Sequence, residues 1–139
     1  MIMASQLTLS IVTPEREVVR VQVDDVELPG TEGYFGVLPG HTPMLATLTV
    51  GRVTYRIGTE RHTLAVAFGF AEVLPDRVTV LAQMAERADD IDLDRATAAR
   101  DRAAARLNRL EPDLDYERAR TALDKASLRL DIASKARRA

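Results

Sequence analysis

The sequence predicts an α+β protein, with an N-terminal antiparallel β-sandwich of about ten short strands followed by a C-terminal antiparallel two-helix hairpin. Apolar and polar residues alternate between residues 6 and 84, which is the period of half-buried strands. From residue 92 the apolar residues recur every three or four positions, and no glycine occurs after Gly69. We therefore expect a sandwich domain over residues 1–86, a linker over 87–91 and a helical hairpin over 92–139.

Turn residues divide the first part of the chain into short strands. The apolar phase of residues 19–23 flips at residues 26–28, and a side-chain period of two cannot flip without an extra residue. We predict a bulge or corner at Asp24 and Asp25, whose side chains, as strand neighbours, would point to opposite faces. Further turns or strand starts are predicted at residues 58–61, 68–70 and 75–76.

Residues 28–51 are unusually rich in turn-forming residues. They hold five of the seven glycines and three of the six prolines, which indicates a defined backbone path. Their single charge, Glu32, offers little for catalysis. Their apolar residues are expected to fold back onto a core: Tyr34, Phe35, Val37, Leu38, Met44, Leu45 and Leu48.

The helical part has a narrow apolar seam. Pro112 separates two periodic stretches by a short connection, which predicts an antiparallel hairpin whose second helix is capped by Asp113 or Asp115. Residues 92–139 contain twelve alanines and nine larger apolar residues, so the seam removes little surface from water. We expect the hairpin to be marginally stable and to open readily.

Composition excludes several classes of function. The net charge is −2, divided as −5 over residues 1–91 and +3 over residues 92–139, and there is no cysteine. No apolar run approaches the roughly 20 residues that cross a bilayer. His41 is interpreted as a hydrogen-bonded turn residue and His62 as an exposed strand residue, so no metal site is expected. The arginine-rich helices contain one aromatic residue, Tyr116, and nine acidic residues, which argues against nucleic-acid binding.

Three short segments resemble a known family in their order and spacing. They are residues 39–45 (Pro-Gly-His-Thr-Pro-Met-Leu), 69–73 (Gly-Phe-Ala-Glu-Val) and 91–96 (Ile-Asp-Leu-Asp-Arg-Ala). Together they resemble the epsilon subunit of the F-type ATP synthase, over nearly the whole chain. The resemblance implies a rotor subunit without an active site or a required cofactor.

In that family the sandwich joins the gamma subunit to the ring of c subunits for proton-driven ATP synthesis. The hairpin lies folded on the sandwich, or extends towards the catalytic alpha and beta subunits and inhibits ATP hydrolysis. The resemblance also implies a peripheral location on the cytoplasmic face of the bacterial plasma membrane, or on the stromal side of the plastid thylakoid, with no insertion into the membrane. The alternative is a free-standing regulatory module that senses ATP.

The resemblance assigns two groups of residues to partner binding. Docking to gamma and the c-ring would use the segment with Gly30, Glu32, Gly33, Gly36, Pro39, His41 and Pro43. Inhibition would use basic residues of the second helix against an acidic segment of the catalytic beta subunit: Arg118, Arg120, Lys125, Arg129, Lys135, Arg137 and Arg138. The alternatives are packing within the chain for the first group and an ordinary charged helix surface with i,i+4 pairs for the second.

The resemblance also implies a regulatory ATP site on the folded hairpin. Ile91 and Ala96 would flank the adenine, Asp92 would accept from its exocyclic amine, and Arg95 would contact the nucleotide. The remaining candidates are Glu86, Arg102, Lys125 and Arg129. Lys125 stands where the family has arginine and so lacks the planar bidentate fork. The structural alternative is that Asp92 caps the first helix and pairs with Arg95.

Overall fold

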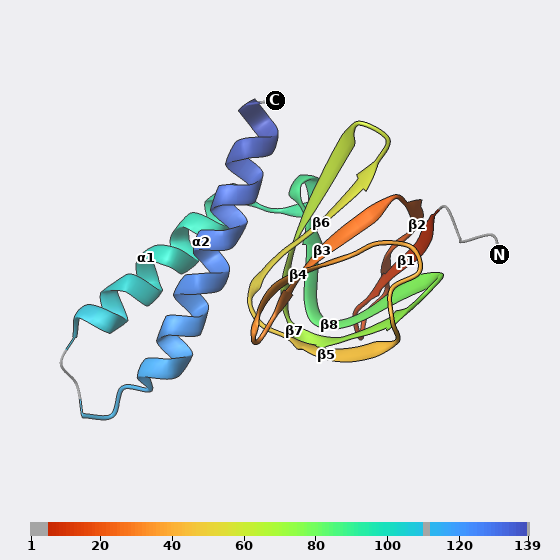
Figure 1. The fold of residues 1–139 in the computed structure, drawn as a ribbon. Coiled ribbons are helices and arrows are strands. Elements are labelled where there is room, and N and C mark those ends of the chain that lie inside the picture. Colours follow the sequence, from red (N-terminus) through yellow and green to blue (C-terminus); the bar gives the residue numbers. More distant parts are fainter. Residues whose placement is uncertain (1–5, 110–111, 139) are drawn as a thin grey trace. The chain divides into compact units, whose positions relative to one another are not determined.

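The computed structural model describes residues 6–109 and 112–138 (Figure 1). The chain divides into two compact units, the first ending at Glu86 and the second beginning at Arg87. The first consists of strands and the second of helices.

Within its described residues, from residue 6 onward, the first unit contains eight strands rather than the expected ten or so. The strands are β1 (Leu7–Val12), β2 (Glu17–Val23), β3 (Asp25–Gly30), β4 (Gly33–Val37), β5 (Met44–Leu48), β6 (Gly51–Ile57), β7 (Glu60–Leu74) and β8 (Arg77–Arg87). The number is lower because β7 and β8 are long, at 15 and 11 residues. Phe68, expected at the start of a new strand, lies inside β7.

The strand order is β2-β1-β8-β7-β5-β3-β4, with β6 pairing to β3 and β7. The pairs β1–β2, β3–β4, β3–β6, β5–β7 and β6–β7 are antiparallel as predicted. The predicted antiparallel sandwich is confirmed with one exception, because β1 runs parallel to β8. The first strand thus lies beside the last, which closes the unit with a pairing of long sequence separation.

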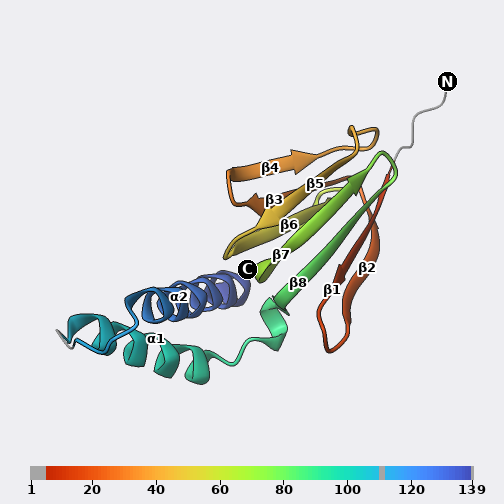
Figure 2. The same ribbon diagram turned by 90° about the horizontal axis from the view of Figure 1, so that it is seen from below.

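A bend in β7 folds the strands into two layers. The first part of β7 pairs with β6 as far as Val66, and the second part pairs with β5 from Gly69. Where the two parts meet, Phe68 has a φ of 59° and Gly69 has a φ of 126°, and both values lie in the left-handed half of the backbone map. Figure 2 shows β3, β4 and β6 in one layer and β1, β2 and β8 in the other.

The core lies between the layers and comes from alternate positions of the strands. In β1, Leu7, Leu9 and Ile11 are fully buried while the residues between them are half-buried. The other strands complete the core with Val18, Val19, Val23, Val26, Leu28, Val37, Leu48, Val53, Tyr55, Leu64, Val66, Ala71, Val73, Val78, Val80, Ala82 and Ala85. A period of two places one face of each strand in the core.

The predicted corner between residues 23 and 25 is confirmed. β2 ends at Val23 and β3 begins at Asp25, so the chain leaves its pairing with β1 and joins the other layer at Asp24.

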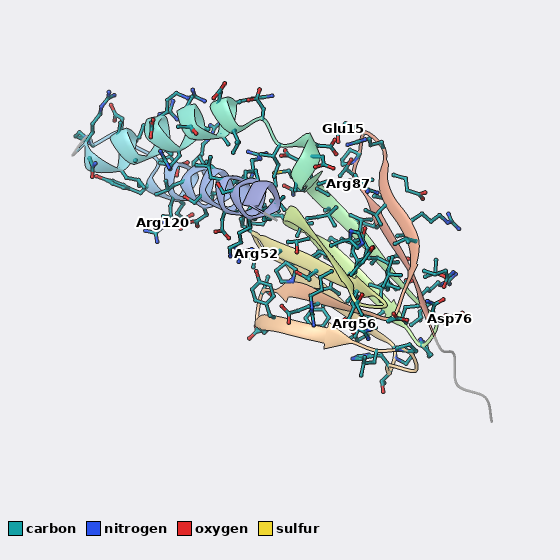
Figure 3. All side chains as sticks on the ribbon, turned by 90° about the horizontal axis from the view of Figure 1, so that it is seen from above. Glu15, Arg52, Arg56, Asp76, Arg87 and Arg120 are labelled. Atoms are coloured by element: carbon teal, nitrogen blue, oxygen red, sulfur yellow. The ribbon has the colours of Figure 1, made fainter. Side chains whose placement is uncertain are left out.

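The prediction that the carboxylates of Asp24 and Asp25 diverge is wrong. Arg56 (labelled in Figure 3) lies with its Nε 2.7 Å from Asp25 and its Nη1 3.5 Å from Asp24. The backbone N–H of Gly58 also donates to Asp24 at 2.6 Å. This bond, then Gln6 and Arg56, lower the pKa of Asp24 below its ordinary value of 3.8. Both carboxylates are therefore structural, because they join the corner to the β6–β7 turn.

The second unit contains a short 3₁₀ turn, η1 (Ala88–Asp90), and two helices, α1 (Leu93–Asn108) and α2 (Tyr116–Arg138). Asp92 caps α1 by accepting the N–H of Arg95 at 3.1 Å. Of the two candidates for the second cap, it is Asp115 that accepts the N–H of Arg118, at 3.1 Å.

The two helices pack as an antiparallel pair through small side chains. Among the described side chains of this unit, the buried ones are Ile91, Ala96, Ala103, Ala119, Ala126, Ile132 and Ala133. Five of these seven are alanines, so the helices meet closely but bury little apolar surface per residue. The predicted alanine seam is therefore present.

Candidate functional site

The predicted docking segment is mainly a β-hairpin rather than a loop. Gly30 is the last residue of β3, Thr31 and Glu32 form a two-residue turn, and Gly33 and Gly36 belong to β4. Gly33 has a φ of 129°, a conformation that L side chains rarely adopt. The turn therefore requires glycine at that position and places Glu32 at an exposed tip.

The second part of the segment is held by main-chain hydrogen bonds. The N–H of Gly40 donates to the Pro75 carbonyl at 2.7 Å, and the N–H of His41 donates to the Leu38 carbonyl at 3.2 Å. The Nδ1 of His41 lies 2.6 Å from the Thr42 carbonyl, which confirms the interpretation of a hydrogen-bonded turn residue. Pro39 is half-buried and Pro43 is exposed. The backbone path is thus defined, as the glycines and prolines predicted.

The expected packing of the segment's apolar residues holds only in part. Val37 and Leu48 are buried, but Tyr34, Leu38, Met44 and Leu45 are exposed. Tyr34 lies on the edge strand β4, Leu38 lies just beyond that strand, and in β5 only Leu48 is buried.

Tyr34 nevertheless has a specific role. Its hydroxyl accepts the backbone N–H of Arg52 at 3.0 Å, a group beyond the end of the β3–β6 pairing. This bond ties β4 to β6 across the sheet.

Three exposed apolar side chains form an outer patch that sequence reasoning missed: Leu45 (71% exposed), Phe70 (50%) and Leu81 (54%). Leu45 pairs with Glu72 and Thr47 with Phe70, so Leu45 and Phe70 are diagonal neighbours on one face. Leu81 lies on β8, the next strand of the order, and points outward because Val80 and Ala82 are buried. The sequence signal for the outward position of Phe70 was the alternation in β7, where Ala71 and Val73 are buried and Phe70 and Glu72 are exposed.

The proposed nucleotide residues lie mostly at the start of the second unit. Ile91 and Ala96 are buried, whereas Asp92 and Arg95 are exposed. One oxygen of Asp92 accepts the capping N–H, as the structural alternative foresaw, but the Arg95 side chain takes no part in that cap. Glu86, at the end of the first unit, is half-buried.

The other nucleotide candidates are on the two helices. Arg102 is exposed on α1, while Lys125 and Arg129 are half-buried on α2. Both α2 residues have interactions within the chain.

The basic residues of α2 include two i,i+4 pairs, as the alternative interpretation expected. Arg120 lies 3.5 Å from Asp124, and Lys135 lies 3.3 Å from Asp131. Arg118 is exposed. The side chains of Arg137 and Arg138 are outside the described part of the structure. Exposed pairs of this kind contribute about 0–1 kcal/mol and open at little cost.

Within residues 6–109 and 112–138, no three His, Asp or Glu side chains are arranged to hold a metal ion. Neither described helix has an apolar stretch long enough to cross a bilayer.

Comparison with protein families decides the relationship of the chain. Residues 6–88 match the β-sandwich domain of the ATP synthase delta/epsilon chain, and residues 89–134 match its long α-helix domain. The chain belongs to this family.

Similar proteins of known name are ATP synthase epsilon chains. The chain is 53% identical over 110 residues to ATP synthase epsilon chain 2 of Syntrophotalea carbinolica, which covers 79% of this chain and 80% of the relative. It is 54% identical over 105 residues to the epsilon chain of Syntrophobacter fumaroxidans, covering 76% and 78%. The resemblance to the epsilon subunit is therefore confirmed.

A solved structure supports the fold of this family member. The chain resembles one chain of the Euglena gracilis mitochondrial ATP synthase, determined as an OSCP/F1/c-ring assembly, with a TM-score of 0.79 and 19% identity. The likeness covers 100% of this chain and 85% of that one. A sandwich followed by two helices is thus an arrangement found in an ATP synthase assembly.

Proposed function

We propose that this chain is a non-catalytic rotor subunit that joins the gamma subunit to the c-ring and inhibits ATP hydrolysis through its two helices. The observation that carries the proposal is the division into a well-packed sandwich with an exposed apolar patch and a separate unit with an alanine seam. The subunit would be peripheral on the cytoplasmic face of the membrane, in contact with the complex rather than with lipid.

The outer patch supports docking to gamma. Leu45, Phe70 and Leu81 expose apolar surface at the middle of a sheet, where no other strand covers them. Exposed apolar patches with polar surroundings mark protein interfaces. The hairpin tip at Glu32 and the turn of residues 38–43 then provide main-chain and polar contacts to the c-ring.

The weak seam supports inhibition by a helical arm. Alanine contacts contribute little at about 25 cal/mol per Å², so the helices separate at a low free-energy cost. An extended α2 would present Arg118, Arg120 and Lys135 to an acidic segment of the catalytic beta subunit. Such charges steer association and set its register.

ATP would favour the closed arm by binding it selectively. The start of α1 holds four of the proposed nucleotide residues, Ile91, Asp92, Arg95 and Ala96. The helix dipole also attracts anions to this end of the helix. A ligand that binds only the closed hairpin stabilises it by mass action. Low ATP would then release the arm to inhibit hydrolysis.

Substitution of Phe70 by serine is expected to weaken binding to gamma by about tenfold or more, because burial of such a side chain contributes about 1.5–3 kcal/mol. The measurement is capture of the purified chain by tagged gamma at graded concentrations. Gln22→Ser, an exposed change on β2, is the control and should bind normally. Equal binding of the two variants would reject the outer patch as the docking surface.

Calorimetry with the full chain tests the ATP site. Heat of binding is expected at millimolar ATP and should disappear in Arg95→Ala, which keeps the helix cap because only the backbone N–H of Arg95 contributes to it. Arg106→Ala, in the last turn of α1, is the matched control and should bind like the parent. The absence of heat with the parent chain would end the proposal of ATP sensing and leave docking and inhibition untouched.

A further inference from the structure

β4 (Gly33–Val37) forms one edge of the strand order and lies at the outside of its layer (Figure 2). The other edge, β2, carries Glu17 and Arg20, which pair at 3.6 Å. Charged residues on an edge discourage the addition of a further strand. β4 has none, since its sequence is Gly-Tyr-Phe-Gly-Val. It is therefore the edge that remains open to strand addition.

The register shows which main-chain groups of β4 point outward. Gly33 pairs with Gly30 across the two-residue turn, so these two residues exchange main-chain hydrogen bonds. Along β4 from Gly33, the N–H and C=O groups of successive residues then point alternately towards β3 and away from it. Tyr34 is opposite Pro29, which has no N–H and whose carbonyl accepts from Thr49. The N–H and C=O groups of Tyr34 and Gly36 consequently face away from β3.

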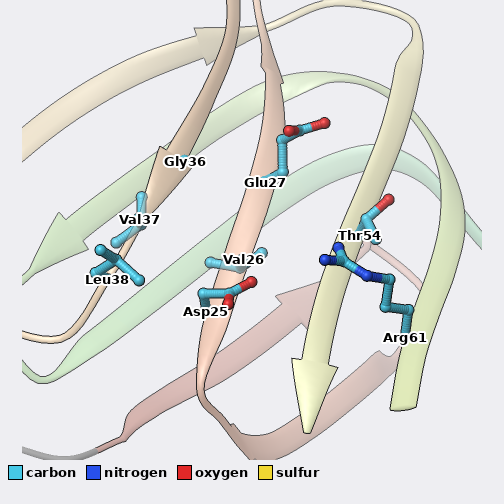
Figure 4. A pocket seen from close by; sticks show the side chains of 8 residues that line it. All are labelled: Asp25, Val26, Glu27, Gly36, Val37, Leu38, Thr54 and Arg61. Atoms are coloured by element: carbon cyan, nitrogen blue, oxygen red, sulfur yellow. The ribbon is translucent and has the colours of Figure 1, made fainter. Parts of the chain in front are cut away.

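A cavity of about 300 Å³ adjoins this edge. Its lining includes Asp25, Glu27, Gly36, Val37 and Arg61 (Figure 4). Glu27 lies directly opposite Gly36 in the register. A side chain added at Gly36 would meet nothing within 4 Å, so the space between Glu27 and the open edge is unfilled.

Glu27 is the carboxylate that a partner would meet there. Asp25 is neutralised by Arg56 at 2.7 Å. Arg61 also lines the cavity: it lies on β7, opposite Arg56, and its side chain reaches across β6 beside Thr54 (Figure 4). Glu27 makes no ion pair within the described part of the chain. The side of the cavity next to β4 is therefore negative, and its complement is a basic group.

We propose that an extended segment of a partner protein adds to β4 as a further strand and inserts a lysine or arginine across Gly36 to Glu27. Main-chain bonds would form to Tyr34 and Gly36, the outward-facing residues. Strands lie about 4.8 Å apart, so a residue of the added strand is about 10 Å from β3, within reach of a long basic side chain when glycine lies between. The inference rests on the proposed function, because β4 belongs to the docking segment.

Amide exchange in the assembled ATP synthase complex tests the inference. The labelled chain exchanges within the complex, is then quenched and dissociated, and is read by NMR. The amides of Tyr34 and Gly36 should exchange at least about 100-fold more slowly in the complex than in the isolated chain. Those of Phe35 and Val37, which face β3, should be slow in both states and provide the control within the strand.

A charge variant tests the basic group. Glu27→Gln should weaken rebinding of the chain to the depleted complex by about tenfold, as expected for loss of a charge-assisted bond. Glu15→Gln, an exposed change in the β1–β2 turn, should rebind normally.

The outcomes separate this inference from the function it rests on. A chain that joins the complex but keeps fast exchange at Tyr34 or Gly36 would overturn the strand addition and leave the function standing. A chain that never joins the complex would overturn both. Protection that appears in the isolated chain as its concentration rises would identify a second copy as the occupant and reject the partner segment.

Discussion

Replacement of Gly69 by alanine is expected to lower the free energy of unfolding of the sandwich by roughly 2–6 kcal/mol, from backbone strain and overpacking together. Gly69 has a φ of 126°, which is accessible almost only to glycine. A Cβ there would overlap the carbonyl oxygen of Leu81 and lie 2.9 Å from the Cα of Ala82. Both obstacles are backbone atoms of β8, which cannot rotate away.

The effect should be large because Gly69 lies at the bend that lets β7 join both layers. Urea denaturation followed by circular dichroism measures it on the isolated chain. Gly36→Ala is the matched control, since a Cβ at that position meets nothing within 4 Å, and it should leave the midpoint almost unchanged. Similar midpoints for the two variants would show that the bend tolerates a side chain.

Deletion of residues 91–139 is expected to raise ATP hydrolysis by the assembled complex while ATP synthesis continues. The two units have separate cores, so the truncated chain retains the sandwich and its outer patch. If nine-tenths of the complexes are held by the extended arm, hydrolysis rises by about tenfold. The assay compares membranes that carry the full and the truncated chain at matched subunit content.

A charge variant distinguishes the effect of the basic residues of the arm from the steric effect of its helices. Replacing Arg118, Arg120 and Lys135 by alanine should give a smaller rise than the deletion, because in the proposed function these charges only steer the arm, and the variant keeps both helices. The deletion should abolish inhibition whether charge or bulk dominates. Unchanged hydrolysis after deletion would contradict an inhibitory arm in this protein.

The family motif of residues 69–73 has a physical explanation in the bend. Gly69 permits both the positive φ and the close approach of β8, and Phe70 then points outward because Ala71 and Val73 point into the core. One glycine therefore sets both the bend of the sheet and the outward orientation of Phe70 in the outer patch. Sequence alone predicted a strand start there, since a bend and a break share the same residue signal.

Local periodicity and capping chemistry were enough to predict most elements from the sequence. The alternation of Leu7, Leu9 and Ile11 specified a strand with one buried face, and Asp92 specified the start of α1. These features depend on interactions within a few residues, which a sequence states directly.

The long-range arrangement was decided only by the tertiary structure. The parallel pairing of β1 with β8 and the convergence of Asp24 and Asp25 on Arg56 join residues far apart in the chain. The outer patch and the open edge of β4 likewise depend on which strands have neighbours. Periodicity states which residues share a face, but only the completed pairing decides whether that face is covered.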